Sequence, residues 1–498
     1  MTGPIGSDDT RYLEFANYFV SFTSFSEIDH AGGRLLFLFL IGIPYKIGGH
    51  AFYAAVANIF YSLITDLMLV LFCWKTLGRR ASLIAAIVMA VNPISIIYPG
   101  MILPDTLLTL FLVASSVLLY HALQDACRKN RYLKFAASGA VACFAYMCKE
   151  PGILMVPIVG AYLFLFPCDG KLRERLIAPL IFMVSFLVVF LFDGLVYVAY
   201  TGDFFYKITA TAICHNQERP HLDLAGFLQT TFGDFVEAFK NGSFFLVPLH
   251  LGFPVMVMAS MVDRRTRIFS LIGLFTLLYL IFGSSSLSEL VSLPLQARYF
   301  QPVIPFVAIA VGVIVERYSF FRSRVAQVAF PCAFGCLVAF YGTNEVFLRA
   351  GTQYESNLMK SFRTAVEVLA EEQKPLYVDP ALYYNAPHFL PRALYNRLVE
   401  IPASDPLKKG YYFIYPELTW LPQDRFEEVK GLNVKLRVAL DWRIANQFRQ
   451  MSDSRILPPY LMREILVYEK EYEREGDKGT PKSIPLRQKK DEKCRNRM

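Results

Sequence analysis

Charged residues are scarce in this chain: they make up 18% of its 498 residues, whereas 54% are hydrophobic. A soluble protein of this length needs far more polar surface to cover its core, so the composition excludes that class. The apolar residues fall in blocks of about twenty between positions 35 and 343, the helix length needed to cross a bilayer core of ~30 Å. The sequence therefore predicts an integral membrane protein.

Cysteine pairs with metal-site or redox spacing are absent too. The nine cysteines are an odd number, none stands in a Cys-x-x-Cys pair, and most lie inside apolar blocks. We therefore expect these cysteines to be small core residues rather than members of a disulfide framework or a metal site. Residues 1–20 also lack the basic start and apolar run of a cleavable signal peptide.

About ten membrane-spanning helices are expected. A shorter apolar stretch, Leu35 to Ile47, carries Pro44 and Lys46 and fits an interfacial or re-entrant segment better than a span. The expected spans are 51–73, 81–99, 105–124, 134–148, 151–167, 176–199, 244–262, 268–284, 300–316 and 324–343.

Groups of basic residues mark every second connection between these spans. They occupy 75–80, 128–134, 171–175, 264–267 and 317–324. The positive-inside rule assigns such loops to the cytoplasm. The segments then predicted outside the cytoplasm are 1–34, 100–105, 200–243 and the C-terminus.

A chain that begins outside the cytoplasm without a signal sequence is hard to export. We therefore expect a transmembrane helix before residue 1, lost through a late start codon or truncation. The alternative is translocation, after insertion, of a short N-terminal tail that carries few positive charges.

Four segments follow from this pattern. Residues 1–50 form a first extracytoplasmic loop with juxtamembrane helices, 51–345 the transmembrane core, 346–475 a small extracytoplasmic α/β domain, and 476–498 a charged tail predicted to be disordered. In the small domain, 356–373 has helical periodicity, and the strand-like runs are 375–379, 411–415 and 465–468.

Acidic residues on the predicted external face are the first candidates for chemistry. Asp8 and Asp9 precede a helix-like stretch, and they suit either an N-cap with a first-turn acid or a general base and metal ligand beside the membrane. Asp105 opens a helix that contains no other Asp, Glu, Lys or Arg. An ionisable residue there is costly enough to suggest function, although Asp105 also suits an N-cap.

Basic residues at the same face suggest an anion site. Lys149, Arg298 and Arg34 lie at the expected ends of apolar segments, where they can face a lipid phosphate or simply form ion pairs and reach the interface. Their collection on one face favours the anion site. His215 and Glu218 in the 201–243 loop could bind a metal, but their spacing matches no known ligand motif and a solvated loop is the alternative.

With these residues assembled, the chain resembles the GT-C membrane glycosyltransferases, in the branch of lipid A aminoarabinose transferases and protein O-mannosyltransferase-like proteins. The family pattern begins with a transmembrane helix that this chain lacks, and its second acid is usually Glu where Asp9 stands here. The similar segments, in order over about residues 1–345, are Asp8-Asp9-Thr10-Arg11-Tyr12, Leu35–Gly48, Leu103-Pro104-Asp105, Cys148-Lys149-Glu150-Pro151-Gly152, Tyr206 to Arg219, and Arg298-Tyr299 with Pro302 and Pro305.

The resemblance implies a mainly α-helical GT-C fold and an inverting transfer of a sugar from a polyprenyl-phosphate donor. The acceptor would be an envelope glycan, lipid or protein on the extracytoplasmic face, and the setting a bacterial inner membrane. Asp8 would deprotonate or orient the acceptor hydroxyl, and Asp105, with Asp9 or His215, would position the acceptor or bind a divalent cation. The donor phosphate would be held by Lys149, Arg298, Arg34 and Arg11.

Two other functions are compatible with the sequence. A transporter or flippase of lipid-linked sugars would carry its charges at mid-membrane, where Asp66 and Asp193 are the main acids, but most other charge lies at the helix ends. A non-catalytic relative could keep the fold and the lipid site without turnover. The sequence does not identify the sugar, the acceptor or any metal requirement, and no nucleic-acid partner is expected.

Overall fold

The computed structural model of the protein forms two compact units, of which the first contains residues 11–347 and the second residues 348–498. Each unit is described by itself. The residues that the structure describes are 8–25, 28–49, 51–166, 172–218, 222–240, 246–284, 290–291, 293, 297–317, 336, 354–372, 374–380, 382–383, 386, 390, 392–402, 406–414, 421–439, 464–470 and 482–483.

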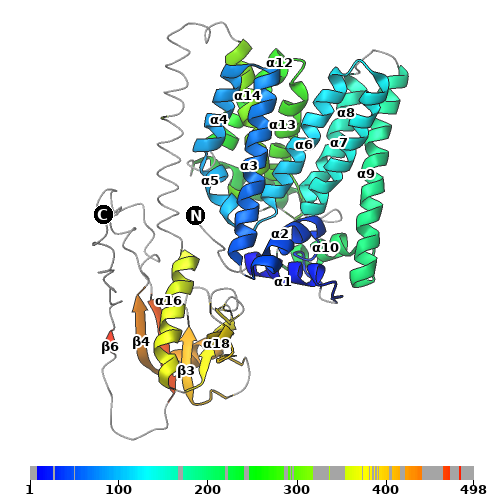
Figure 1. Ribbon diagram of the computed structural model, residues 1–498. Helices are drawn as coiled ribbons and strands as arrows, with labels where there is room; N and C mark the ends of the chain where they lie inside the picture. Colours follow the sequence, from blue (N-terminus) through cyan, green and yellow to red (C-terminus); the bar gives the residue numbers. More distant parts are fainter. Residues whose placement is uncertain are drawn as a thin grey trace, which may run out of the picture. The chain divides into compact units, whose positions relative to one another are not determined.

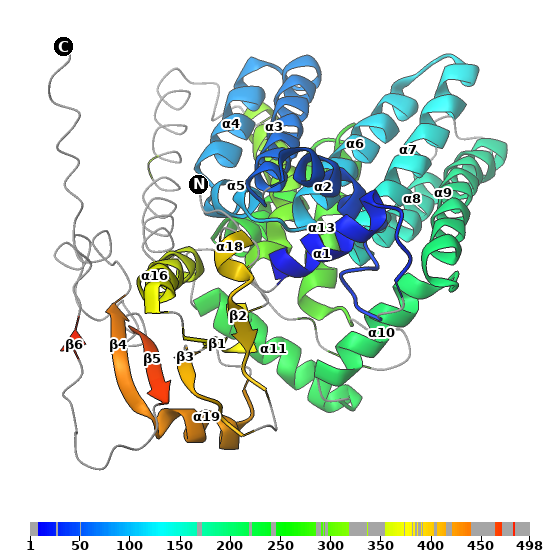
Figure 2. The ribbon, with the colours of Figure 1, turned by 60° about the horizontal axis from the view of Figure 1, so that its bottom comes forward.

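The first unit is a bundle of helices (Figure 1). Its long helices run side by side, and the short helices α1, α2 and α10 gather at the end of the bundle where α3 begins (Figures 1 and 2). The elements are α1 (Asp8–Val20), α2 (Leu35–Gly48), α3 (Ala51–Thr76), α4 (Arg79–Val91), α5 (Pro93–Ile97), η1 (Tyr98–Gly100), α6 (Asp105–Gln124), α7 (Arg128–Cys148), η2 (Glu150–Leu154), α8 (Met155–Leu165), α9 (Leu172–Thr201), α10 (Tyr206–Glu218), α11 (Leu224–Lys240), η3 (Leu246–Leu251), α12 (Gly252–Val262), α13 (Arg267–Phe282), η4 (Ala297–Val303) and α14 (Ile304–Arg317).

Four helical segments are long and apolar enough to cross a membrane: α3, α6, Leu176–Thr201 within α9, and Arg298–Arg317. A fifth span results if Arg79–Val91 and Pro93–Gly100, which are bent by 67°, count as one. The protein is therefore an integral membrane protein with several apolar spans, as predicted.

The expected span at 81–99 is broken rather than continuous. Pro93 begins α5, where it has no backbone N–H to donate and its ring would clash with a preceding helical turn. The Asn92 side chain accepts a hydrogen bond from the Ile94 N–H at 2.8 Å and so caps the new helix. The bend leads the chain into the segment before Asp105.

Several expected spans correspond to helices that are apolar but shorter than a bilayer requires. They are Glu150–Leu165, Val247–Val262 and Arg267–Phe282. Helix α7 covers the span expected at 134–148, and the span expected at 324–343 lies outside the described residues except for Cys336. The total of ten therefore stays a prediction.

Helix α2 occupies the segment expected to be interfacial or re-entrant. At 14 residues it is about 21 Å long, too short to span a bilayer core of ~30 Å. It ends at Gly49, whose φ of 65° is left-handed and whose N–H bonds the Tyr45 carbonyl. The Leu35 N–H donates to the Tyr197 hydroxyl at 3.1 Å, so α9 fixes the start of α2.

Small residues set the packing of α6, α7 and α9. Ser115 on α6 and Ser138 on α7 each donate a hydrogen bond to the other's carbonyl at 2.8 Å. A Cβ atom on Gly139 would lie 2.1 Å from the Phe182 carbonyl oxygen of α9. Close backbone approach through small residues and polar contacts is a common way to pack helices in membranes.

The second unit contains a mixed sheet with the strand order β2-β1-β3-β5-β4-β6. Strand β1 runs parallel to its neighbours β2 and β3, whereas β5 runs antiparallel to β3 and β4. The strands are β1 (Leu376–Val378), β2 (Leu398–Glu400), β3 (Gly410–Ile414), β4 (Asn433–Ala439), β5 (Glu464–Lys470) and β6 (Lys482–Ser483), and the helices are α16 (Tyr354–Leu369), η6 (Ala370–Glu372), α18 (Arg392–Tyr395) and α19 (Gln423–Lys430).

Buried side chains cover both faces of this sheet. Phe362 of α16 packs with Val378 and Phe413 on one face, and Tyr412 packs with Val429 of α19 on the other. The helix and three strands expected from the sequence are present, and β2 and β4 are additional. Strand β6 lies within the segment predicted to be a disordered tail.

Candidate functional site

A buried ion pair joins the start of α6 to the end of α7. The Lys149 Nζ atom lies 2.6 Å from the Asp105 Oδ1 atom, and both residues are more than 90% buried. The same ammonium lies 3.9 Å from the centre of the Tyr299 ring, which is itself in contact with the Arg298 guanidinium. Buried charges are costly to desolvate, so a pair in this position is a candidate functional centre.

A network of buried amides holds the segment that precedes Asp105. The Asn58 Nδ2 atom of α3 donates to the Met101 carbonyl at 2.6 Å and to the Thr106 hydroxyl at 3.2 Å. The Gln301 Nε2 atom donates to the same hydroxyl at 3.1 Å. Helix α3, the first turn of α6 and η4 are thereby locked around Asp105.

Two further cations lie beside Glu150. The field of Arg34, Lys207 and Lys149 acts on this carboxylate, which accepts a hydrogen bond from the Thr211 hydroxyl at 3.4 Å. Lys207 is buried, and its ammonium donates to the Tyr146 carbonyl and lies 4.1 Å from the centre of the Tyr146 ring. Glu150 and the Asp105–Lys149 pair therefore belong to one charged region at this end of the bundle.

Arg34 carries a buried donor with no partner. The residue is 7% exposed, and its Nε atom makes no hydrogen bond in the described part of the chain. An unsatisfied buried donor costs about 1–3 kcal/mol, and more when the group is charged. The arrangement can therefore accept an anion, which would satisfy the guanidinium.

A family model described as dolichyl-phosphate-mannose-protein mannosyltransferase matches residues 29–193. This part of the chain is therefore similar to that family. The matched segment contains Arg34, Asp105, Lys149 and Glu150 of the charged region. Its description names a sugar linked to a lipid phosphate, so the resemblance drawn from the motifs is confirmed over this segment.

Solved structures of glycosyltransferases show a similar fold over most of this chain. ArnT from Cupriavidus metallidurans bound to undecaprenyl phosphate is similar with a TM-score of 0.54 and 14% identity, over 93% of this chain and 94% of that one. The same protein in its apo state has a TM-score of 0.54 and 15% identity, over 93% of this chain and 94% of that one. An Archaeoglobus fulgidus oligosaccharyltransferase complex with Zn and sulfate scores 0.49 with 12% identity, over 80% of this chain and 58% of that one, too low to assign a fold. No curated protein matches the sequence.

The structure brings some of the predicted site residues together. Asp105 and Lys149 form the ion pair, and both Lys149 and Arg298 make cation–π contacts with the Tyr299 ring. The positive charge of Arg34 interacts with the Glu150 carboxylate. The sequence predicted Asp105 and Lys149 as separate site residues without indicating that they form a pair.

Arg11 has acidic partners instead. Its guanidinium lies 2.7 Å from Glu14 and 2.8 Å from Asp29, and its side chain is about one-third exposed. A role in donor binding would require exchange of one of these carboxylates for a phosphate. That role stays a prediction.

The remaining candidates are placed only by their backbone. Asp8 and Asp9 form the first turn of α1, and His215 and Glu218 lie in the last turns of α10. Their side chains are outside the description. Among the described residues there is no cluster of three or more His, Cys, Asp or Glu side chains suited to a metal, so the divalent cation also stays a prediction.

Three buried polar residues of the site were missed from the sequence. Asn58 could have been recognised, because it is a single amide inside an apolar span. Polar residues seldom lie there without a partner. Lys207 and Gln301 had no comparable signal, because both stand among other polar residues in segments expected to be loops or helix starts.

Proposed function

We propose that the chain is a glycosyltransferase that moves a sugar from a polyprenyl-phosphate donor to an envelope glycan, lipid or protein. The transfer would invert the configuration at the sugar carbon that is attacked, and it would occur on the extracytoplasmic face. The observation that carries this proposal is the buried cation region in which the Arg34 Nε atom has no partner. The match of residues 29–193 to the dolichyl-phosphate-mannose-protein mannosyltransferase model supports the same donor class.

The cations suit the leaving group of such a reaction. As the bond between the sugar carbon and the phosphate oxygen breaks, negative charge grows on the departing polyprenyl phosphate. Fixed, partly desolvated donors stabilise that charge far better than water does. Arg34, Lys149 and Arg298 are proposed to hold the phosphate, with Arg11 as a further ligand and Lys207 strengthening the local positive field.

The acidic residues are proposed to activate and orient the acceptor. Asp8 is proposed to take the proton of the acceptor hydroxyl while its oxygen forms the new bond to the sugar carbon from the opposite side. Asp105 is already compensated by Lys149, so it is better suited to orient that lysine and the acceptor than to act as the base. Asp9 would assist at the same end of α1.

The topology proposed from the basic loops fits this chemistry. The isoprenoid would remain among the apolar helices while its phosphate meets Arg34 and Lys149 at one end of them. A bacterial inner membrane is the proposed location. The C-terminal domain is proposed to contribute to acceptor choice.

The decisive experiment is transfer from a panel of polyprenyl-phosphate sugars by the purified full chain. Turnover should fall by about 10²–10⁴ in Asp8→Asn, which removes the base, while donor binding is retained. Arg34→Gln should instead weaken donor binding. Asp424→Asn is the matched control, because Asp424 is also an acid in the first turn of a helix, α19.

Two results would contradict the proposal. Equal turnover in wild type and Asp8→Asn would exclude Asp8 as the base. Donor binding without turnover, for every donor tested, would favour a non-catalytic lipid-binding relative, and movement of the intact donor across vesicles would favour a flippase.

A further inference from the structure

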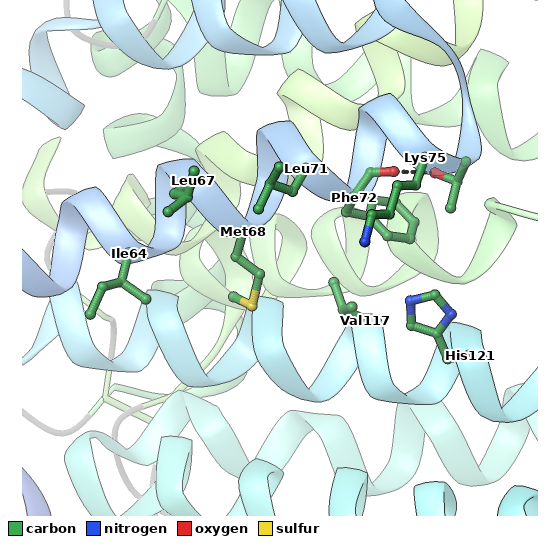
Figure 3. Close-up of a pocket in the computed structure, with 9 residues that line it drawn as sticks. Ile64, Leu67, Met68, Leu71, Phe72, Lys75, Val117 and His121 are labelled. Carbon is green, nitrogen blue, oxygen red and sulfur yellow. Dashed lines mark hydrogen bonds between the residues drawn. The ribbon is translucent and has the colours of Figure 1, made fainter.

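A groove of about 320 Å³ lies between α3 and α6 (Figure 3). Its walls are apolar and include Ile64 and Leu71 of α3 and Val117 of α6. Lys75 and His121 project into one end of it from the two facing helices (Figure 3). The groove is therefore apolar along its length and polar at one end only.

The length of this groove matches one leaflet of a bilayer. The eleven helical steps from Ile64 to Lys75 correspond to about 16 Å. Half of a hydrocarbon core of ~30 Å is about 15 Å. One acyl chain can therefore lie along the groove while its headgroup reaches Lys75, near the last residue of α3.

The polar end is basic and available. Lys75 is exposed, and within the described part of the chain its ammonium has no ion-pair partner. Asp125, the acid four residues after His121, is already paired with Lys134 at 2.5 Å. A phosphate at headgroup depth would supply the missing negative charge, and the exposed imidazole of His121 could donate a hydrogen bond to it.

This groove is separate from the candidate active site. Asn58, which belongs to the site, lies seventeen residues before Lys75 on α3, or about 25 Å along the helix axis. The two features thus belong to opposite halves of the bundle. The groove does not depend on the donor site or on its chemistry.

We propose that the groove binds one anionic phospholipid from the leaflet opposite the candidate active site. An acyl chain packs along Ile64, Leu71 and Val117, and the headgroup phosphate meets Lys75 and His121. The occupant is a membrane lipid because Leu67 and Leu71, 58% and 47% exposed, open the groove towards the hydrocarbon that surrounds α3. It is anionic because the polar end offers an uncompensated positive charge.

The test compares two photoactivatable lipids in nanodiscs that contain the full chain. Phosphatidylglycerol and phosphatidylcholine carry the same acyl probe at equal mole fractions, and crosslinks to α3 and α6 are quantified. A lysine near the membrane surface contributes about 1 kcal/mol towards an anionic lipid, so phosphatidylglycerol should label the groove about fivefold more than phosphatidylcholine. Lys75→Gln should abolish this preference.

Lys129→Gln is the matched control, because Lys129 is an exposed lysine at the start of α7. It should leave the preference unchanged. Leu71→Trp should reduce labelling by both lipids, because its bulk fills the groove. Equal labelling of the wild type by the two lipids, or a preference that survives Lys75→Gln, would overturn the proposal.

Discussion

Removal of one member of the Asp105–Lys149 pair leaves the other charge buried without compensation. Such a loss typically costs about 3–5 kcal/mol, whereas replacement of both partners by neutral groups is often harmless. The pair is thus informative, because its contribution to stability can be separated from its contribution to chemistry.

Lys149→Met should lower the free energy of unfolding of the detergent-purified chain by about 3 kcal/mol. The double variant Asp105→Asn, Lys149→Met should recover most of that loss. It should nevertheless remain inactive in sugar transfer, because the phosphate ligand is still missing. Recovery of activity together with stability would show that the pair is structural.

At the scale of the element, the close packing of α6, α7 and α9 depends on small residues where the helices meet. Gly139→Ala places a Cβ atom 2.1 Å from the Phe182 carbonyl, so the helices must separate. We expect a loss of about 1–3 kcal/mol in thermal unfolding. Gly160→Ala is the control: no atom lies within 4 Å of a Cβ there, and the change should stabilise α8 by up to about 1 kcal/mol.

The sheet of the second unit carries an acid-sensitive contact. Burial by itself raises the pKa of Glu469, but Lys374 and Lys435 outweigh it, and the pKa lies below its ordinary value of 4.5. The stability from this carboxylate is therefore present above pH 4.5 and is lost as the pH falls below it.

Hydrogen exchange of the full chain at falling pH should show β3 and β5 losing protection below that point. Glu469→Gln should remove the pH-dependent step. Glu427→Gln, at an exposed pair with Lys430, should leave it in place. Protection that falls identically in the wild type and Glu469→Gln would assign the acid sensitivity to other groups.

Elements were predictable from the sequence where apolar length alone decides. The span at 105–124 has the predicted bounds, and α3 ends within three residues of its predicted end. The break at Pro93 was not predicted, because the residues on both sides of it are equally apolar. Hydropathy does not reveal a change in the direction of the helix axis. Within the site, Asp105 and Lys149 were found as separate charges, but their pairing needs the three-dimensional approach of α6 and α7.

For the whole molecule, the orientation in the membrane follows from the basic loops and is open to direct test. Cys127 is exposed, just before α7, in a connection predicted to be cytoplasmic. In a variant that keeps Cys127 as its only cysteine, a membrane-impermeant maleimide should not label intact cells but should label inverted vesicles. Labelling of intact cells would reverse the topology and place the candidate site in the cytoplasm.

The hydrogen bonds of Asn58 have a consequence for the interpretation of natural variants. The bent segment before α6 presents the Pro99 and Met101 carbonyls to α3, and the Asn58 amide donates a hydrogen bond to each, at 3.4 and 2.6 Å. A change of Asn58 to leucine would score as an improved membrane helix on any hydrophobicity scale. It would also remove both of these hydrogen bonds where little water can replace the amide, and it would leave the Met101 carbonyl with the Leu103 N–H alone. At this position, a more lipophilic residue should be harmful.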